Sequence, residues 1–160
     1  MQQHLKHPVF KIIAKVATQL NVDAYVIGGF VRDIFLNRPS KDVDIVVLGN
    51  GPDFATAVAT EINVQVNVFK SFGTAMLRYQ DLEVEFVGAR KESYRIDSRK
   101  PIVEDGSLED DQKRRDFTIN TLSIQLNPER FGILIDFFSA QKDIKEKSIR
   151  VLHNLSFVED

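Results

Sequence analysis

Two aspartates that alternate with aliphatic residues are the groups in this sequence best suited to bind divalent cations. Asp42 and Asp44 lie in the run Asp-Val-Asp-Ile-Val-Val, whose alternation predicts a β-strand. Alternate side chains point to one face of a strand, so these carboxylates should lie about 6.5–7 Å apart along it. From such positions they can lean together and hold two Mg²⁺ ions about 3.5–4 Å apart.

A glycine pair and an arginine before the aspartates suit a bound phosphate. Gly28 and Gly29 lack a Cβ, so the backbone can turn sharply and approach a ligand closely. The following residues have helical spacing, and the free N–H groups at a helix start attract phosphate. Arg32 adds a fixed positive charge one turn later. A lone Gly-Gly or Asp-x-Asp is usually a turn or a solvated strand end, but both in this order predict a site for Mg²⁺ and a nucleoside triphosphate.

A third carboxylate for such a site is expected on a neighbouring strand, because Mg²⁺ prefers octahedral oxygen ligation. Glu83 and Glu85 share one face of a strand predicted at residues 82–87. The strand pattern alone does not choose between the two glutamates. The alternative is that both are ordinary exposed strand residues.

A helix predicted to begin at Ser107 carries a cluster of charged residues. Arg114, Arg115 and Asp116 are consecutive, so they point about 100° apart and cannot all share one face of the helix. Either arginine could reach a nucleotide, and Asp116 could accept a hydrogen bond from a ribose hydroxyl. The alternative is a solvated cluster of charges without a ligand.

The periodicity of apolar residues predicts the elements that position these groups. An amphipathic helix is expected at 8–20, and a second one, capped by Asp53, ends near residue 62. Strands are expected at 24–27, 42–47, 64–68, 74–79, 82–87, 122–126 and 133–137. Residues 88–116 are highly charged and predict a long mobile loop, of a kind that often serves a functional site.

Composition places the chain among globular proteins. Its 160 residues fit one domain, and 43% are hydrophobic and 28% charged. The absence of cysteine excludes disulfides and thiolate metal sites. No apolar run approaches a membrane span and no signal peptide is visible, so a cytoplasmic protein with no membrane partner is expected. The net charge of −2 argues against a stand-alone nucleic-acid binder, but not against an enzyme that binds RNA elsewhere.

Two motifs resemble the class II tRNA nucleotidyltransferase and bacterial poly(A) polymerase family. One is Gly28-Gly29-Phe30-Val31-Arg32-Asp33 followed by Asp42-Val43-Asp44-Ile45-Val46-Val47, and the other is Arg114-Arg115-Asp116-Phe117-Thr118-Ile119-Asn120. The resemblance extends from about Tyr25 to Asp160. It implies an α+β fold, the polymerase-β-like nucleotidyltransferase head, whose mixed sheet of about five strands is backed by helices.

The resemblance also implies a role for each candidate residue. Asp42 and Asp44 would hold two Mg²⁺ ions, and Glu85, in a segment similar to the family's, would be the third metal ligand and catalytic carboxylate. Glu83 would then be a solvent-facing neighbour. The nucleotide-binding residues would be Gly28, Gly29, Arg32, Arg114, Arg115 and Asp116.

The reaction implied is attack of an RNA 3′-hydroxyl on the α-phosphate of ATP or CTP, with Mg²⁺ as cofactor. Its product would be C or A added to the 3′ end of tRNA. Alternatives that the sequence leaves open are a poly(A) polymerase of the same family, a small-molecule nucleotidyltransferase and a non-catalytic nucleotide-binding module.

The last residues, Phe157-Val158-Glu159-Asp160, resemble the start of the family's base-reading segment, Glu-Asp-x-x-Arg. Residues 1–160 are therefore expected to be the catalytic head of a longer enzyme. Helical neck, body and tail domains would bind most of the tRNA, so the head alone would lack the parts that read the base and hold the RNA.

Overall fold

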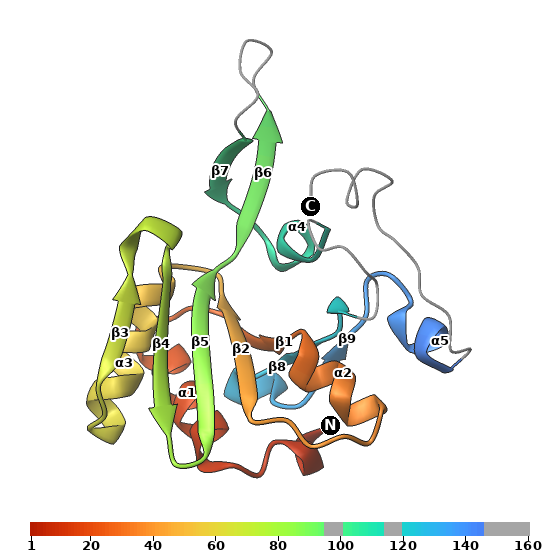
Figure 1. Cartoon of the computed structure of the whole chain (residues 1–160), viewed down its shortest axis with the longest axis horizontal. Coiled ribbons are helices and arrows are strands. Elements are labelled where there is room, and N and C mark those ends of the chain that lie inside the picture. Colours follow the sequence, from red (N-terminus) through yellow and green to blue (C-terminus); the bar gives the residue numbers. More distant parts are fainter. Residues whose placement is uncertain (95–100, 114–119, 146–160) are drawn as a thin grey trace.

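The computed structural model describes residues 1–94, 101–113 and 120–145; at 90–94, 101–105, 113 and 143–145 it describes the backbone alone. Its centre is a mixed sheet of seven strands in the order β3-β4-β5-β2-β1-β8-β9 (Figure 1). These strands are β1 (Ala24–Ile27), β2 (Asp42–Val47), β3 (Val66–Phe69), β4 (Thr74–Tyr79), β5 (Leu82–Gly88), β8 (Ser123–Gln125) and β9 (Leu134–Ile135). Among the described strands of this sheet, β2 and β5 are parallel neighbours, and the other neighbouring pairs are antiparallel.

The predicted α+β architecture with a mixed sheet is confirmed. The sheet has seven strands where about five were expected, and the strands at its two edges are short. β3 has four residues and β9 has two. Short edge strands leave few backbone groups exposed for pairing with another chain.

Helices α1 (Pro8–Leu20) and α3 (Gly51–Ile62) pack against each other on one face of the sheet and cover the main core. In Figure 1 the strands β3, β4 and β5 pass in front of these two helices. Apolar residues recur every three or four positions, so each helix presents one apolar stripe. Phe10 of α1 and Phe54 of α3 are almost wholly buried, and the rings of Phe54 and Phe86 lie 5.8 Å apart.

The first turn of α3 has a different capping residue from the one predicted. The sequence predicts Asp53, whereas the structure has Asn50, whose Oδ1 accepts a hydrogen bond from the Asp53 N–H at 2.9 Å. Pro52 lies in the first turn, where a helix needs no N–H from it. The helix therefore begins at Gly51, two residues before Asp53.

Helix α2 (Gly29–Phe35) joins β1 to β2 and contacts both strands. Val31 is fully buried, and the Phe30 ring lies 5.4 Å from that of Phe10. This packing fixes the first turn of α2 at the strand ends that carry the predicted glycine turn and the two aspartates.

Residues 88–116 do not form the predicted loop in the part that the structure describes. β6 (Arg90–Tyr94) and β7 (Pro101–Asp105) pair as an antiparallel hairpin that projects from the main sheet (Figure 1). Pairing satisfies backbone N–H and C=O groups without a large buried core, which is how a polar segment can become regular. Helix α4 (Leu108–Lys113) follows, and the Ser107 hydroxyl and Asp110 carboxylate cap it reciprocally, each accepting a backbone N–H at 3.1 Å.

The last described element is α5 (Ala140–Lys145). Its first turn is capped by Asp136, whose Oδ1 accepts the Ala140 N–H at 2.7 Å. Across the described ranges, no helix has both the length and the apolar character needed to cross a membrane.

Two glycines lie where the loop after β2 meets the end of β5, and they should be essential for stability. A Cβ on Gly88 would lie 2.5 Å from the Gly49 carbonyl oxygen, and one on Gly51 would lie 2.8 Å from the Gly88 nitrogen. Gly88→Ala is expected to lower the free energy of unfolding by about 1–3 kcal/mol, because the backbone must move. Gly49→Ala should cost less, since its Cβ would meet the Val22 side chain at 3.2 Å. Urea unfolding measures the free energy of unfolding of both variants. Equal losses of stability in Gly88→Ala and Gly49→Ala would contradict this packing.

Candidate active site

The pairing of β2 with β5 brings the predicted carboxylates together on one face of the sheet. In this parallel pair, Asp44 lies opposite Glu85 and Asp42 opposite Glu83. Partners in register point to the same side, and neighbouring strands lie about 4.8 Å apart. The alternate residues Val43 and Ile45 are buried in the core on the other side of the sheet, as the pattern of the strand requires.

The four carboxylates differ in their surroundings. Asp42, Asp44 and Glu83 are exposed, whereas Glu85 is partly buried. Burial raises the pKa of Glu85, and the negative charge of Asp44 raises it further. Ionised carboxylates at this place therefore repel each other, and a cation between them would relieve the repulsion.

The donor set fits Mg²⁺ in its chemistry, because all the oxygen atoms come from carboxylates on adjacent strands. Within the described ranges, no three His, Cys, Asp or Glu side chains converge closely enough to hold a metal ion. The backbone thus aligns Asp42, Asp44 and Glu85, and their side chains must turn toward one another to coordinate a cation. Their role as metal ligands stays a prediction.

The raised pKa of Glu85 has a consequence for stability. A glutamate whose pKa is higher in the folded state destabilises the fold once it is ionised, and this penalty disappears below its ordinary value of 4.5. Glu85→Gln is therefore expected to raise the unfolding temperature at pH 7.5 and to leave it unchanged at pH 4. Thermal unfolding at the two pH values tests this, with the exposed neighbour Glu83→Gln as control. A Glu85→Gln protein that is less stable at pH 7.5 would contradict the electrostatic explanation.

The glycine turn lies directly against the second aspartate. Gly28 has φ 69° and ψ −138°, a conformation that residues with a Cβ rarely adopt. A Cβ at Gly28 would lie 3.4 Å from Asp44 Oδ2. The bare backbone of the turn is therefore close to a carboxylate oxygen, and α2 begins at the next residue, Gly29.

Arg32 is held in place by two side chains. Its Nε donates to Asp33 Oδ1 at 3.2 Å, and its Nη1 donates to Asn120 Oδ1 at 3.0 Å. Its Nη2 lies 3.3 Å from the position that a Cβ on Gly29 would occupy. The guanidinium therefore folds back over the glycine turn, beside the place where phosphate is predicted to bind.

Asn120 contacts a predicted site residue, although the sequence patterns assign it no role. Its signal in the sequence is its place at the end of the motif that begins with Arg114. Residues 114–119, which include Arg114, Arg115 and Asp116, lie outside the described residues, as do Glu159 and Asp160. The nucleotide contacts of that motif stay predictions.

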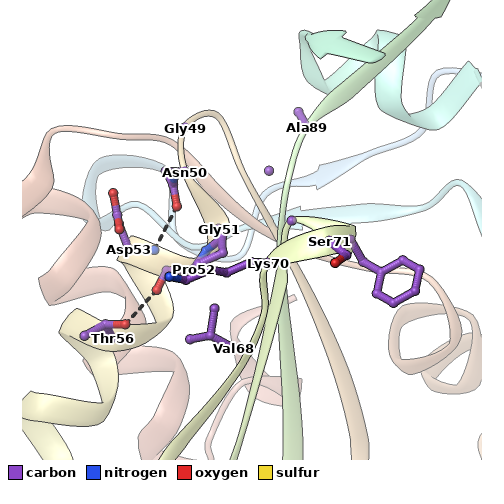
Figure 2. Close-up of a pocket in the computed structure, with 13 residues that line it drawn as sticks. Gly49, Asn50, Gly51, Pro52, Asp53, Thr56, Val68, Lys70, Ser71 and Ala89 are labelled. Atoms are coloured by element: carbon purple, nitrogen blue, oxygen red, sulfur yellow. Dashed lines mark hydrogen bonds between the residues drawn. The ribbon is translucent and has the colours of Figure 1, made fainter. Parts of the chain in front are cut away.

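A hollow of about 720 Å³ lies at another place, where the loop after β2 meets the 3-10 turn Lys70–Phe72 (Figure 2). Asn50 and Thr56 line it, and their side chains make the local bonds of α3: Thr56 Oγ1 donates to the Pro52 carbonyl at 2.9 Å. None of the four carboxylates lines this hollow. The predicted metal ligands therefore lie outside this hollow.

This chain is similar in sequence and in fold to proteins that are already known. The family described as the poly A polymerase head domain matches residues 24–150. The A-adding tRNA nucleotidyltransferase of Geobacter sulfurreducens is 46% identical over 164 aligned residues, 100% of this chain but 19% of that protein. A solved tRNA nucleotidyltransferase with a primer tRNA and an incoming ATP analog is 43% identical, with a TM-score of 0.82, covering 92% of this chain and 41% of that one. A tRNA-processing enzyme solved with CTP is 42% identical, with a TM-score of 0.81, covering 92% of this chain and 37% of that one.

Proposed function

This chain belongs to the poly A polymerase head-domain family, and from that membership we propose that it is the catalytic head of a tRNA nucleotidyltransferase. The reaction is template-independent addition of A or C, from ATP or CTP, to the 3′ end of tRNA. The observation that carries the proposal is the register that sets Asp44 opposite Glu85 and beside Gly28. The solved relatives with a primer tRNA and with CTP support the choice of substrates.

Mg²⁺ is the proposed cofactor, held by Asp42, Asp44 and Glu85. These carboxylates would hold the ion, which would lower the pKa of an attacking hydroxyl and shield the charge of a triphosphate. Glu85 lies on the opposite side of Asp44 from β1, which leads into the glycine turn. This arrangement supports the proposal that Glu85 faces the RNA hydroxyl and that Gly28 faces the triphosphate.

The reaction needs no nucleophile from the protein. The RNA 3′ oxygen forms a bond to the α-phosphorus, the bond from that phosphorus to the pyrophosphate oxygen breaks, and the hydroxyl proton passes to solvent. The chain contributes position and charge, which dominate such reactions. The turn at Gly28 and Gly29 lets phosphate oxygens approach the backbone, and the planar guanidinium of Arg32 suits them. Arg114, Arg115 and Asp116 are proposed to bind the triphosphate and ribose.

A more specific proposal is that the enzyme adds only the terminal A. The relative from Geobacter sulfurreducens, an A-adding tRNA nucleotidyltransferase, supports it. The chain covers 19% of that relative. Residues 1–160 are therefore proposed to act as the head, with most of the tRNA bound by parts that its longer relatives contain.

The function is tested with tRNA transcripts that end before CCA, after C and after CC. The chain, and a chimera in which it replaces the matching region of the Geobacter sulfurreducens relative, are given ATP, CTP or both with Mg²⁺. Extension only of the transcript that ends in CC, with ATP, identifies an A-adding enzyme. Stepwise completion from the bare end identifies a CCA-adding enzyme, and a long adenylate tail identifies a poly(A) polymerase. No incorporation by a folded chimera that still binds ATP would overturn the proposal.

The contact between Arg32 and Asn120 gives a separate prediction. Asn120→Ala removes a hydrogen bond to a charged group, a loss of about 1.5 kcal/mol, and should weaken ATP binding about tenfold. Asn120→Asp keeps an acceptor oxygen but adds a negative charge beside Arg32, so its loss should be at least as large. Titration calorimetry with ATP measures both, with the exposed Gln19→Ala as control. Unchanged affinity in both variants would show that Asn120 does not position Arg32 for phosphate.

A further inference from the structure

The sheet face that carries the carboxylates continues onto β4 and β3. Met76 of β4 lies opposite Glu85, and Arg78 lies opposite Glu83. At the other end of β4, Thr74 lies opposite Phe69 of β3. Partners in register share a face, so these side chains form one row beside the candidate active site. We call Phe69, Thr74, Met76 and Arg78 the β3–β4 strip.

The β3–β4 strip is open in the part of the molecule that the structure describes. Helices α1 and α3 pack on the other face of the sheet, and Figure 1 looks onto β3, β4 and β5 with these helices behind them. Phe69 is 46% exposed, although it is aromatic. Thr74 and Met76 are partly buried, and Arg78 is exposed.

Arg78 makes no ion pair with any described residue, although Glu83 lies opposite it in the pairing of β4 with β5. Its guanidinium is therefore available for a phosphate, which it can bind through two parallel hydrogen bonds. The strip extends about 13 Å from Thr74 to Arg78, at about 3.3 Å per residue. That length suits a short single strand.

The arrangement of the site decides from which side the second substrate arrives. Gly28, Gly29 and Arg32 lie on the β1 side of Asp44, so the triphosphate approaches from there. Glu85 lies on the β5 side of Asp44. In the proposed function the attacking hydroxyl therefore comes from the β5 side, and the β3–β4 strip is the surface that follows β5 in this direction.

From these observations we propose that the β3–β4 strip seats the last nucleotides of the RNA 3′ end. Phe69 stacks on a base, which an aromatic ring can do whatever the sequence, and Arg78 contacts a backbone phosphate. Because the whole chain has a net charge of −2, attraction of RNA to this face depends on such local cations. The proposal rests on the proposed function, since it names the surface that holds the RNA substrate of the same site.

The test is direct binding of a fluorescent RNA minihelix that ends in CC by the 160-residue chain, at several salt concentrations. Phe69→Ala is expected to weaken binding about tenfold, the effect of losing one stacked base. Arg78→Ala is expected to weaken binding and to reduce the slope of log affinity against log salt by about 0.7–1, for one lost phosphate contact. Both variants should bind ATP with unchanged affinity.

Two control variants match these changes at other places. Val68→Ala truncates the residue next to Phe69; the Val68 side chain faces the other side of β3. Arg130→Ala removes an exposed arginine beyond β8. Both should bind the minihelix like the unaltered chain. If Phe69→Ala and Arg78→Ala behave like these controls, or if the unaltered chain binds no minihelix, the proposal is overturned.

Two further results separate this proposal from its alternatives. If the unaltered chain fails to bind ATP with Mg²⁺ and its chimera transfers no nucleotide, the proposed function fails, whatever the strip does. If sedimentation shows a concentration-dependent dimer that Phe69→Ala abolishes, the exposed ring serves self-association, and the assignment to RNA is overturned.

Discussion

Asp44→Ala is expected to lower nucleotide transfer by about 10³-fold or more and to leave the fold intact. Asp44 lies opposite Glu85 and beside the Gly28 turn, so it is next to both predicted substrate sides. Loss of a metal-binding carboxylate removes several kcal/mol of transition-state stabilisation, and about 4 kcal/mol corresponds to 10³-fold. Its side chain is exposed in the structure, so its removal leaves no cavity in the core.

The effect of Asp44→Ala is measured as kcat/KM for ATP and a tRNA transcript in the chimera described above, with thermal unfolding as the check on folding. Asp42→Ala should lose activity to a similar extent. Glu83→Gln is the matched control, because Glu83 lies on the same face but is assigned no metal. Activity within tenfold of the unaltered protein in Asp44→Ala would refute the metal assignment.

Gly28→Ala is expected to have the second largest effect, on both stability and activity. Its φ of 69° and ψ of −138° are strained for any residue with a Cβ, and such strain costs about 1–3 kcal/mol. The new Cβ would also lie 3.4 Å from Asp44 Oδ2 and cover backbone that is predicted to face the phosphates. For a chain of this size, the loss corresponds to a fall in unfolding temperature of about 2–12 °C.

Gly29→Ala is the contrasting variant for this prediction. Gly29 is the first residue of α2, and a Cβ there would meet the far end of the Arg32 side chain at 3.3 Å. It should therefore unfold at nearly the same temperature as the unaltered protein. If Gly28→Ala is as stable and as active as Gly29→Ala, the turn does not need its positive φ.

One topological feature explains why these few residues meet. β2 and β5 are the parallel pair of the main sheet, and α3, β3 and β4 lie between them in the sequence. Parallel strands need such a long connection. Residues 42–44 and 83–85 are therefore distant in the chain but adjacent in the sheet.

The sequence by itself determined the local elements and most of the candidate groups. The alternation in residues 42–47 predicts a strand with both aspartates on its open face, and the glycine pair predicts the turn before α2. Such patterns are local because a side chain's direction follows from the repeat of its own strand or helix. The mixed α+β fold followed from the resemblance of the motifs to a known family, and it is confirmed.

Only the tertiary structure decided which of these groups are neighbours. The register of β2 with β5 sets Glu85, and not Glu83, opposite Asp44. The fold also brings Asn120 within hydrogen-bond distance of Arg32. The structure also showed paired strands at 90–94 and 101–105 where the charged composition predicts a loop, and Asn50 in place of Asp53 as the cap of α3. Pairing between distant strands depends on how the whole core packs, so a local pattern cannot specify it.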